Sequence, residues 1–305
     1  MPGGAGKMKK LAAEQGIDLA SLKKIVKRLV TAPMEGSEGK ENSAQLLSVL
    51  LEQHVMDDPP VTKTLVSAGA VKPLVDLVKE GNDGGQIHAA ACLARIAANT
   101  PEHGDKIAQA GGIKPLVELL RLGSQKAQMS AASALASLSE DHEHQKPIIA
   151  AGAIAPLVRL VRVGIADAQV HAAFAIANLS DGNPEAQNAV ASAGVVPLLL
   201  GMLNAGSAQM SAAKALAKVA FDNREIQDAI ALEGGIAPLL AILNGVNIPA
   251  QVEAAGALAN LARNNEQTQA AIFKAGGIGP LLAMLPTRSP QAQARGAEAL
   301  AQLAR

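Results

Sequence analysis

The sequence predicts an all-α protein, a solenoid of six three-helix repeats preceded by a degraded N-terminal capping repeat. The main observation is a phrase such as AGGIKPLVELL, variants of which recur six times along the 305 residues. Each copy carries a proline, and these prolines lie 41 or 42 residues apart: Pro73, Pro115, Pro156, Pro197, Pro238 and Pro280. A fixed period near 40 residues is typical of stacked-repeat proteins, in which each unit packs only against its neighbours. A glycine before each proline and an alanine-rich segment after it recur with the same period.

Each repeat is expected to contain three helices. A short first helix, such as 101–110 (PEHGDKIAQA), ends near a glycine, which can adopt the left-handed conformation that closes a helix. These glycines are Gly69, Gly111, Gly152, Gly194, Gly234 and Gly276. The recurrent proline then begins the second helix, where its missing N–H would be unpaired in any case. The third helix, such as 169–181 (QVHAAFAIANLSD), is rich in alanine, the best helix former, whose small side chain lets helices approach closely.

The repeats divide the chain. Before them, 18–30 spaces leucine and valine at helical intervals, and 43–55 resembles a third helix. Residues 17–58 are therefore predicted to be a degraded capping repeat, since terminal repeats are atypical. Residues 1–16 are predicted to be a disordered basic tail. Residues 59–305 hold the six repeats, placed at 60–100, 101–141, 142–182, 183–222, 223–264 and 265–305.

The amino-acid composition limits the classes of partner and the cellular compartments that suit this chain. Lys and Arg number 27 and Asp and Glu also 27, so no global field favours nucleic acid or an anionic membrane. A single cysteine, Cys92, excludes an intrachain disulfide and fits a reducing compartment. No apolar run reaches the roughly 18 to 20 residues of a membrane span, and the N-terminus has no apolar signal-peptide core. The chain has no Trp, no Tyr and three Phe, so a strong aromatic anchor would have to come from a partner.

A three-helix repeat with Gly-Gly-Ile-x-Pro-Leu between its first two helices and Ala-Leu-Ala-Asn-Leu in the third resembles the armadillo repeat. The resemblance covers roughly 60–305 in six in-phase copies. It implies a right-handed superhelix whose third helices line a concave groove for extended peptides. Family members serve in nuclear import, adhesion and signalling scaffolds, ubiquitin ligases and cilia.

The residues support such a groove independently. Three columns of the third helices vary from repeat to repeat, while most other positions stay Ala or Leu. Within a helix the three positions lie three and then four residues apart, which places them on one face. A face that varies while the opposite face stays alanine is expected to face solvent. The candidates for partner contact in these columns are His88, Arg95, Ser137, His171, Phe174, Asn178, Lys214, Lys218, Glu253 and Asn260.

The columns depart from the family pattern. The asparagine that hydrogen-bonds a ligand's backbone in peptide-binding members is retained only at Asn178 and Asn260, with Gln302 as a substitute. The column that carries tryptophans in nuclear-import adaptors has no Trp and one aromatic, Phe174. Since Lys214 and Lys218 also lie on this face, an acidic or mixed-charge partner suits the central groove better than a basic peptide.

Several other motifs are better explained by structural roles than by function. His142-Glu143-His144 could offer two metal ligands, but a solvated turn is the favoured interpretation, because a metal needs three or four convergent ligands. Cys92 is interpreted as an inert buried residue. A glutamine recurs near the start of every third helix and is interpreted as structural. A basic N-terminal cluster is interpreted as a solvated helix face, with contact to an acidic partner, membrane surface or nucleic acid as the alternative: Lys7, Lys9, Lys10, Lys23, Lys24, Lys27 and Arg28.

The resulting hypothesis is a non-enzymatic protein-interaction scaffold that binds an extended or helical segment of a partner protein in its concave groove. We expect no cofactor, no metal, no small-molecule substrate and no nucleic acid. One alternative is a structural subunit of a large assembly, for example ciliary or cytoskeletal, held through its edges and ends. Another is a nuclear-import-type adaptor with a non-classical groove. The expected location is cytoplasmic, with nuclear and ciliary locations as alternatives.

Overall fold

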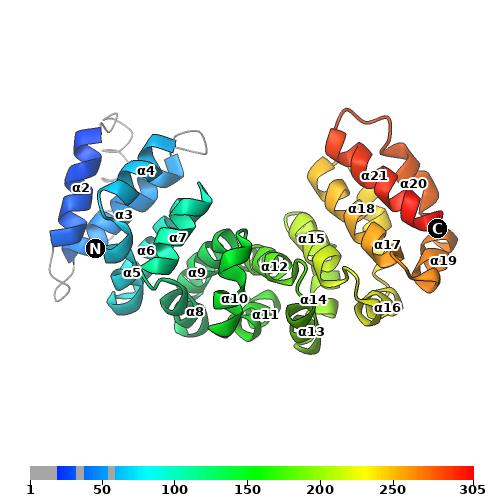
Figure 1. Ribbon diagram of the computed structural model, residues 1–305, viewed down its shortest axis with the longest axis horizontal. Coiled ribbons are helices and arrows are strands. Elements are labelled where there is room, and N and C mark those ends of the chain that lie inside the picture. Colours follow the sequence, from blue (N-terminus) through cyan, green and yellow to red (C-terminus); the bar gives the residue numbers. More distant parts are fainter. Residues whose placement is uncertain (1–18, 32–37, 54–58) are drawn as a thin grey trace. The chain divides into compact units, whose positions relative to one another are not determined.

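The computed structural model describes residues 19–31, 38–53 and 59–305. Over these ranges the chain forms twenty helices, α2 to α21, and no strand (Figure 1). The predicted all-α class is confirmed. The chain divides into two compact units, which meet between Ala153 and Ile154, inside the repeat placed at 142–182. The predicted tail at 1–16 lies outside the described residues, as do Lys7, Lys9 and Lys10 of the basic cluster.

Unit 1 contains the helices up to Ala153. The first two, which fall in the stretch predicted to cap the solenoid, are α2 (Leu19–Thr31) and α3 (Glu38–Gln53). The first full triplet is α4 (Pro59–Ser67), α5 (Val71–Glu80) and α6 (Asp83–Ala97). It is followed by α7 (Pro101–Gln109), α8 (Ile113–Leu122), α9 (Gln125–Leu138) and α10 (His142–Ala150).

Unit 2 continues the same order of short, medium and long helices. It begins with α11 (Ile154–Val163), α12 (Ala166–Ser180), α13 (Pro184–Ser192), α14 (Val195–Met202) and α15 (Gln209–Val219). It ends with α16 (Arg224–Leu232), α17 (Ile236–Leu243), α18 (Ile248–Ala262), α19 (Glu266–Lys274), α20 (Ile278–Ala283) and α21 (Pro290–Leu303).

The prolines, glycines and glutamines that recur in each repeat have the structural roles that the sequence predicts. Each recurrent proline lies in the first turn of a second helix, as Pro238 does in α17. All six recurrent glycines have a positive φ, between 77° and 82°. The recurrent glutamine is structural: Gln86, Gln169 and Gln251 each donate from Nε2 to a carbonyl near the end of the preceding second helix. Such bonds satisfy carbonyls that the helix itself leaves without a partner.

The core lies along the third helices. In unit 1, α3, α6 and α9 pack side by side, and in unit 2 α12, α15, α18 and α21 do the same (Figure 1). Their buried positions are mainly alanine, with leucine between repeats, as at Ala172, Ala173 and Leu179 in α12. The variable columns lie on the opposite face of each third helix, where most side chains are half-buried and some, such as Asn260, are buried.

Among the helices that the structure describes, none is by itself long and apolar enough to span a membrane. The pair α16 and α17, bent by 81°, reaches the required length and composition only when the two are taken together.

Candidate functional site

Three of the predicted contact residues lie in unit 1, on α6 and α9. His88 is half-buried, and its Nδ1 lies 2.9 Å from Oγ of Ser48 on the neighbouring α3. Arg95 is exposed in the last turn of α6. Ser137 is half-buried near the end of α9 and lines a cavity of about 500 Å³ between the ends of α6 and α9. Arg95 is thus the most accessible of the three side chains.

In unit 2 the variable columns bring an aromatic ring and an ammonium group together. His171, Phe174 and Asn178 lie half-buried along α12. Nζ of Lys214, on the adjacent α15, lies 5.3 Å from the centre of the Phe174 ring. A cation over an aromatic face at this distance is attracted by the ring's electrons, and the pair presents a combined apolar and positive surface.

The second lysine of α15 is paired within the chain. Nζ of Lys218 lies 2.7 Å from Oδ2 of Asp181, the residue that follows α12. The two side chains are 29% and 37% exposed, so water reaches the pair and screens it. The positive charge of Lys218 is therefore partly neutralised by Asp181 within the chain.

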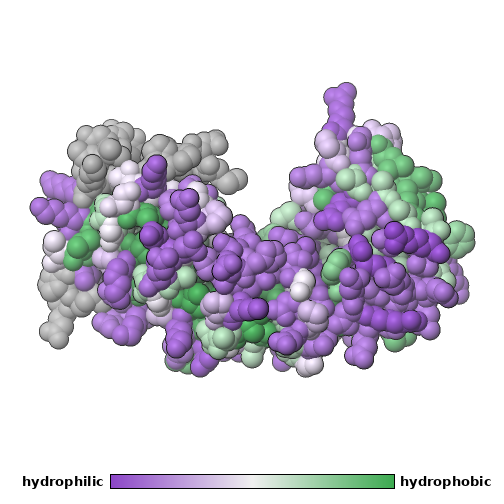
Figure 2. Space-filling model, in the orientation of Figure 1, coloured by the Kyte–Doolittle hydropathy of each residue, from purple (hydrophilic) through white to green (hydrophobic). Residues whose placement is uncertain are grey.

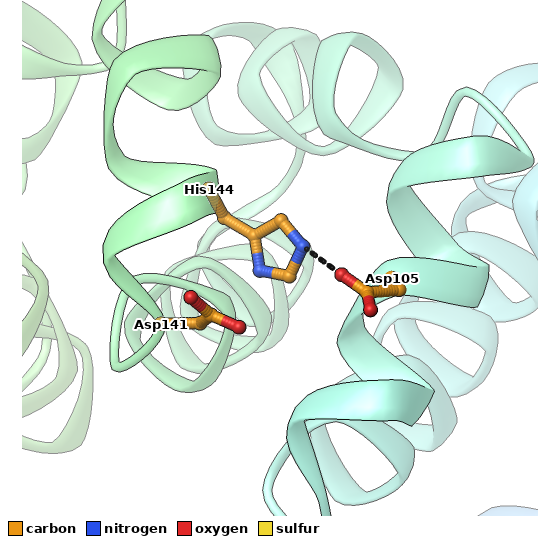
Figure 3. Close-up of side chains that lie close together, drawn as sticks. All are labelled: Asp105, Asp141 and His144. Carbon is orange, nitrogen blue, oxygen red and sulfur yellow. Dashed lines mark hydrogen bonds and ion pairs between the residues drawn. The ribbon is translucent and has the colours of Figure 1, made fainter.

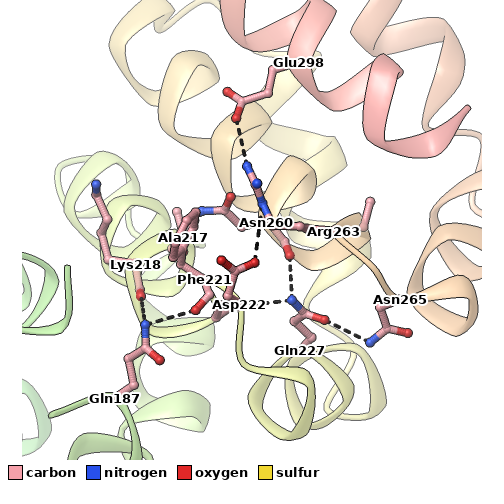
Figure 4. Close-up of polar contacts among 12 residues, drawn as sticks. Gln187, Ala217, Lys218, Phe221, Asp222, Gln227, Asn260, Arg263, Asn265 and Glu298 are labelled. Atoms are coloured by element: carbon pink, nitrogen blue, oxygen red, sulfur yellow. Dashed lines mark hydrogen bonds and ion pairs between the residues drawn. The ribbon is translucent and has the colours of Figure 1, made fainter. Parts of the chain in front are cut away.

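Asn260 lies deeper than the sequence suggests. It is only 8% exposed, and its Nδ2 donates to the backbone carbonyl of Ala217 at 2.8 Å (Figure 4). Glu253, in the first column of the same helix, is half-buried. The amide donor of Asn260 is committed to the neighbouring α15, so a ligand's carbonyl would have to displace that bond.

A cluster around Arg263 was missed at the sequence level. Its guanidinium lies 4.9 Å from the centre of the Phe221 ring, and its Nη2 lies 3.4 Å from Oε1 of Glu298 on α21. Oε2 of Glu298 also accepts from Arg295 at 2.7 Å. Arg263 and Phe221 follow the third helices, beyond the three aligned columns, which is why the alignment did not include them. A fourth column, taken just after each third helix, would have found Asp181, Phe221 and Arg263.

The interpretation of His142-Glu143-His144 as a solvated turn is wrong. These residues form the first turn of α10, and His144 is only 4% exposed. Its ring reaches Asp105 on α7, 39 residues earlier (Figure 3). Local spacing could not indicate this partner, because it is brought in by the stacking of two repeats.

Known proteins with similar sequences or structures share the helical repeat fold described above. The family model described as Armadillo/beta-catenin-like repeat matches residues 58–98. One engineered protein of known structure is 32% identical, covering 97% of this chain and 70% of its own, with a TM-score of 0.78. A second is 34% identical over 77% of this chain and 96% of its own, with a TM-score of 0.70. A search among curated proteins finds no match.

The likeness extends to designed relatives. A designed armadillo repeat protein in complex with the peptide (KR)4 is 23% identical, covers 92% of this chain and 99% of its own, and has a TM-score of 0.54. The helix triplets and the packed third helices define an α-solenoid repeat protein. The matched model identifies residues 58–98 as an armadillo/beta-catenin-like repeat, and the chain shares the fold of these designed armadillo repeat proteins, as the sequence phrases predict.

Proposed function

We propose that this chain is a non-enzymatic protein-interaction scaffold, which binds an extended or helical segment of a partner protein on the exposed faces of its third helices. The observation that carries the proposal is the pairing of Phe174 with Lys214 on α12 and α15. It is a half-exposed apolar and cationic surface on a face whose opposite side is packed alanine. Two designed armadillo repeat structures that share the fold, one in complex with the peptide (KR)4 and one designed for modular peptide recognition, support this use of the fold.

The charge on this face favours an acidic or mixed-charge partner. Lys214 is balanced by an aromatic ring rather than by a carboxylate, so its full charge is available to a ligand. Lys218 can exchange Asp181 for a ligand carboxylate at little net cost, because exposed ion pairs contribute about 0–1 kcal/mol. The balanced total charge argues against nucleic acid, and we propose neither a cofactor nor a small-molecule substrate.

The alternatives remain proposals with their own support. A structural subunit held through its ends is favoured by the apolar surface over α20, where Leu282 and Leu285 are 49% and 37% exposed (Figure 2). Their counterparts one repeat earlier, Leu240 and Leu243, are buried. A nuclear-import-type adaptor would need the groove to accept basic peptides despite its lysines. We propose a cytoplasmic location, with nuclear and ciliary locations as alternatives, since a chain whose single cysteine is Cys92 fits a reducing compartment.

Peptide binding tests the proposal. Labelled extended peptides of acidic, mixed and basic composition are titrated with the full chain, and binding is followed by fluorescence anisotropy. We expect acidic or mixed peptides to bind best, and Phe174→Ala and Lys214→Ala each to weaken binding at least about tenfold, a loss of about 1.4 kcal/mol. Lys274→Ala, at an exposed lysine of the first helix α19, is the matched control and leaves binding unchanged.

Two other results of these binding experiments would support the alternative functions. Preference for basic peptides would reject the charge assignment and favour the import-type adaptor. Partner capture that survives Phe174→Ala and Lys214→Ala but is abolished by Leu282→Asp would reject the third-helix face and favour the end-contact alternative.

A further inference from the structure

Three metal-ligating side chains converge in unit 1, where the repeats placed at 101–141 and 142–182 meet. Asp105 comes from α7, Asp141 caps the N-terminus of α10, and His144 lies in its first turn. One ligand atom from each lies within 4.8 Å of the other two (Figure 3). The closest pair is Nε2 of His144 and Oδ1 of Asp105, 3.1 Å apart.

The hydrogen bonds of His144 indicate what this site requires. Its Nδ1 lies 3.2 Å from the backbone carbonyl of Leu138, which can only accept, so Nδ1 carries the hydrogen. In a neutral ring Nε2 then holds a lone pair, and it faces the carboxylate of Asp105, which is also an acceptor. Either a second ring proton on Nε2 or a metal ion between the two groups satisfies such a pair of facing acceptors. Donation from one ring nitrogen to a backbone carbonyl, with the other nitrogen free to coordinate, is the usual arrangement of a metal-bound histidine.

The neighbouring repeat leaves room for this ring. Gly104 occupies a column that is glutamine in the next four repeats: Gln145, Gln187, Gln227 and Gln269. A Cβ at Gly104 would lie only 2.9 Å from Cε1 of His144, closer than such atoms approach. A side chain at position 104 would therefore clash with His144, so glycine at this position makes room for the buried imidazole. The repeat placed at 60–100 also lacks the glutamine and has Thr62 at this column.

We propose that Asp105, Asp141 and His144 bind a divalent transition-metal ion of the Zn²⁺ class. One nitrogen and two carboxylate oxygens suit Zn²⁺ better than Mg²⁺ or Ca²⁺, which prefer oxygen alone. Two ligands at about 2.0–2.2 Å from one ion lie about 3–3.5 Å apart, so the pair formed by His144 and Asp105 is already suitably spaced. The two carboxylates balance the charge of the ion.

Asp141 completes the site without giving up its structural role. Its Oδ1 accepts from the backbone N–H of Glu143, which leaves Oδ2 for the ion. It must close by about 1–2 Å to reach the bond length given above. The cavity of about 500 Å³ beside it, also lined by Gly104 and His144, supplies space for water as the remaining ligand. The bound ion would tie α7 to α10 and so link two consecutive repeats.

Metal titration of the full chain tests this site. Co²⁺, which reports its coordination by visible absorbance, and Zn²⁺, followed by calorimetry, are each titrated into the protein. We expect one ion per chain, and a loss of affinity of at least about tenfold in Asp105→Asn and in His144→Gln. Asp141→Asn is expected to lose affinity as well, although asparagine caps a helix as well as aspartate does.

The matched control is His142→Gln, which removes an exposed histidine two residues from His144 and leaves affinity unchanged. Circular dichroism verifies that each variant is folded. Asp105 has a half-exposed side chain, so Asp105→Asn decides the question even where His144→Gln is destabilised. Absence of stoichiometric binding, or binding that these three ligand variants leave intact, overturns the proposal. A doubly protonated His144 ring that persists in the presence of Zn²⁺, seen by NMR, overturns it too and identifies an ion pair instead.

Discussion

Replacing Gln227 by leucine should measure how strongly the first helices hold consecutive repeats together. Gln227, in α16, is 1% exposed and bridges two third helices. Its Nε2 donates to the carbonyl of Ala220 at 3.2 Å and to that of Asn260 at 2.9 Å, and its Oε1 accepts from Asn265 at 3.1 Å (Figure 4). Gln227→Leu keeps a similar volume and removes all three bonds.

The expected cost follows from which partners are left without a bond. Asn265 keeps its bond to Asp228 at 2.8 Å, so its amide is still satisfied. Ala220 directly follows α15 and Asn260 lies in the last turn of α18, and the carbonyls of both residues lose a donor. Each lost bond costs about 0.5–1.5 kcal/mol net, and the greater apolar surface of leucine offsets part of it. We therefore expect the free energy of unfolding to fall by about 1–2 kcal/mol.

Hydrogen exchange is the suitable assay, because a repeat protein can open locally rather than unfold in one step. Faster exchange should be concentrated in α16 and in the last turns of α15 and α18. Gln267→Leu, at an exposed glutamine of α19, is the control and should change protection by less than about 0.5 kcal/mol. Equal protection in the two variants would refute the view that this bridge couples the repeats.

The remaining predictions concern the backbone, the core and the binding face. Gly234→Ala should destabilise the fold by about 1–2 kcal/mol in urea unfolding, because its φ is 82°, whereas Gly201→Ala inside α14 should stabilise it by about 0.5–1 kcal/mol. Leu239→Ala, at a fully buried site, should cost about 2–5 kcal/mol by the same measurement. Cys92 should react with a thiol reagent only when unit 1 opens, and rapid labelling of the native chain would contradict its burial. Asp181→Asn should strengthen binding of acidic peptides measured by anisotropy, since it releases Lys218 from its ion pair.

The sequence predicts the helices well because their boundaries are set by local chemistry. The proline in the first turn of α17 and the positive φ of Gly234 after α16 follow from the residues themselves. The asparagine before α16 likewise acts as a cap, since the side chain of Asn223 accepts from Ile226 N–H. These features need no knowledge of distant contacts, and they repeat in each copy.

The candidate site was harder to predict because its contacts join different repeats. Asn260 matches a column that carries ligand-binding asparagines in relatives, yet its depth beneath the surface depends on α15, 43 residues away along the chain. His144 appears in the sequence beside His142, but only stacking determines that one is buried and the other exposed. Periodicity identifies the face on which a residue lies and not how far its neighbours cover it.

Variation within the columns therefore has two physical sources. A position can vary because it faces solvent, as Arg95 does, or because it pairs with its counterpart in the next repeat, as Phe174 does with Lys214. The contact between Phe174 and Lys214 depends on both residues, so the residue at such a position is linked to its counterpart in the next repeat as well as to solvent. A ligand on unit 2 competes with such internal pairs and gains only the difference between old and new contacts. Selectivity then requires several repeats to be engaged at once, which a stacked array of third helices provides.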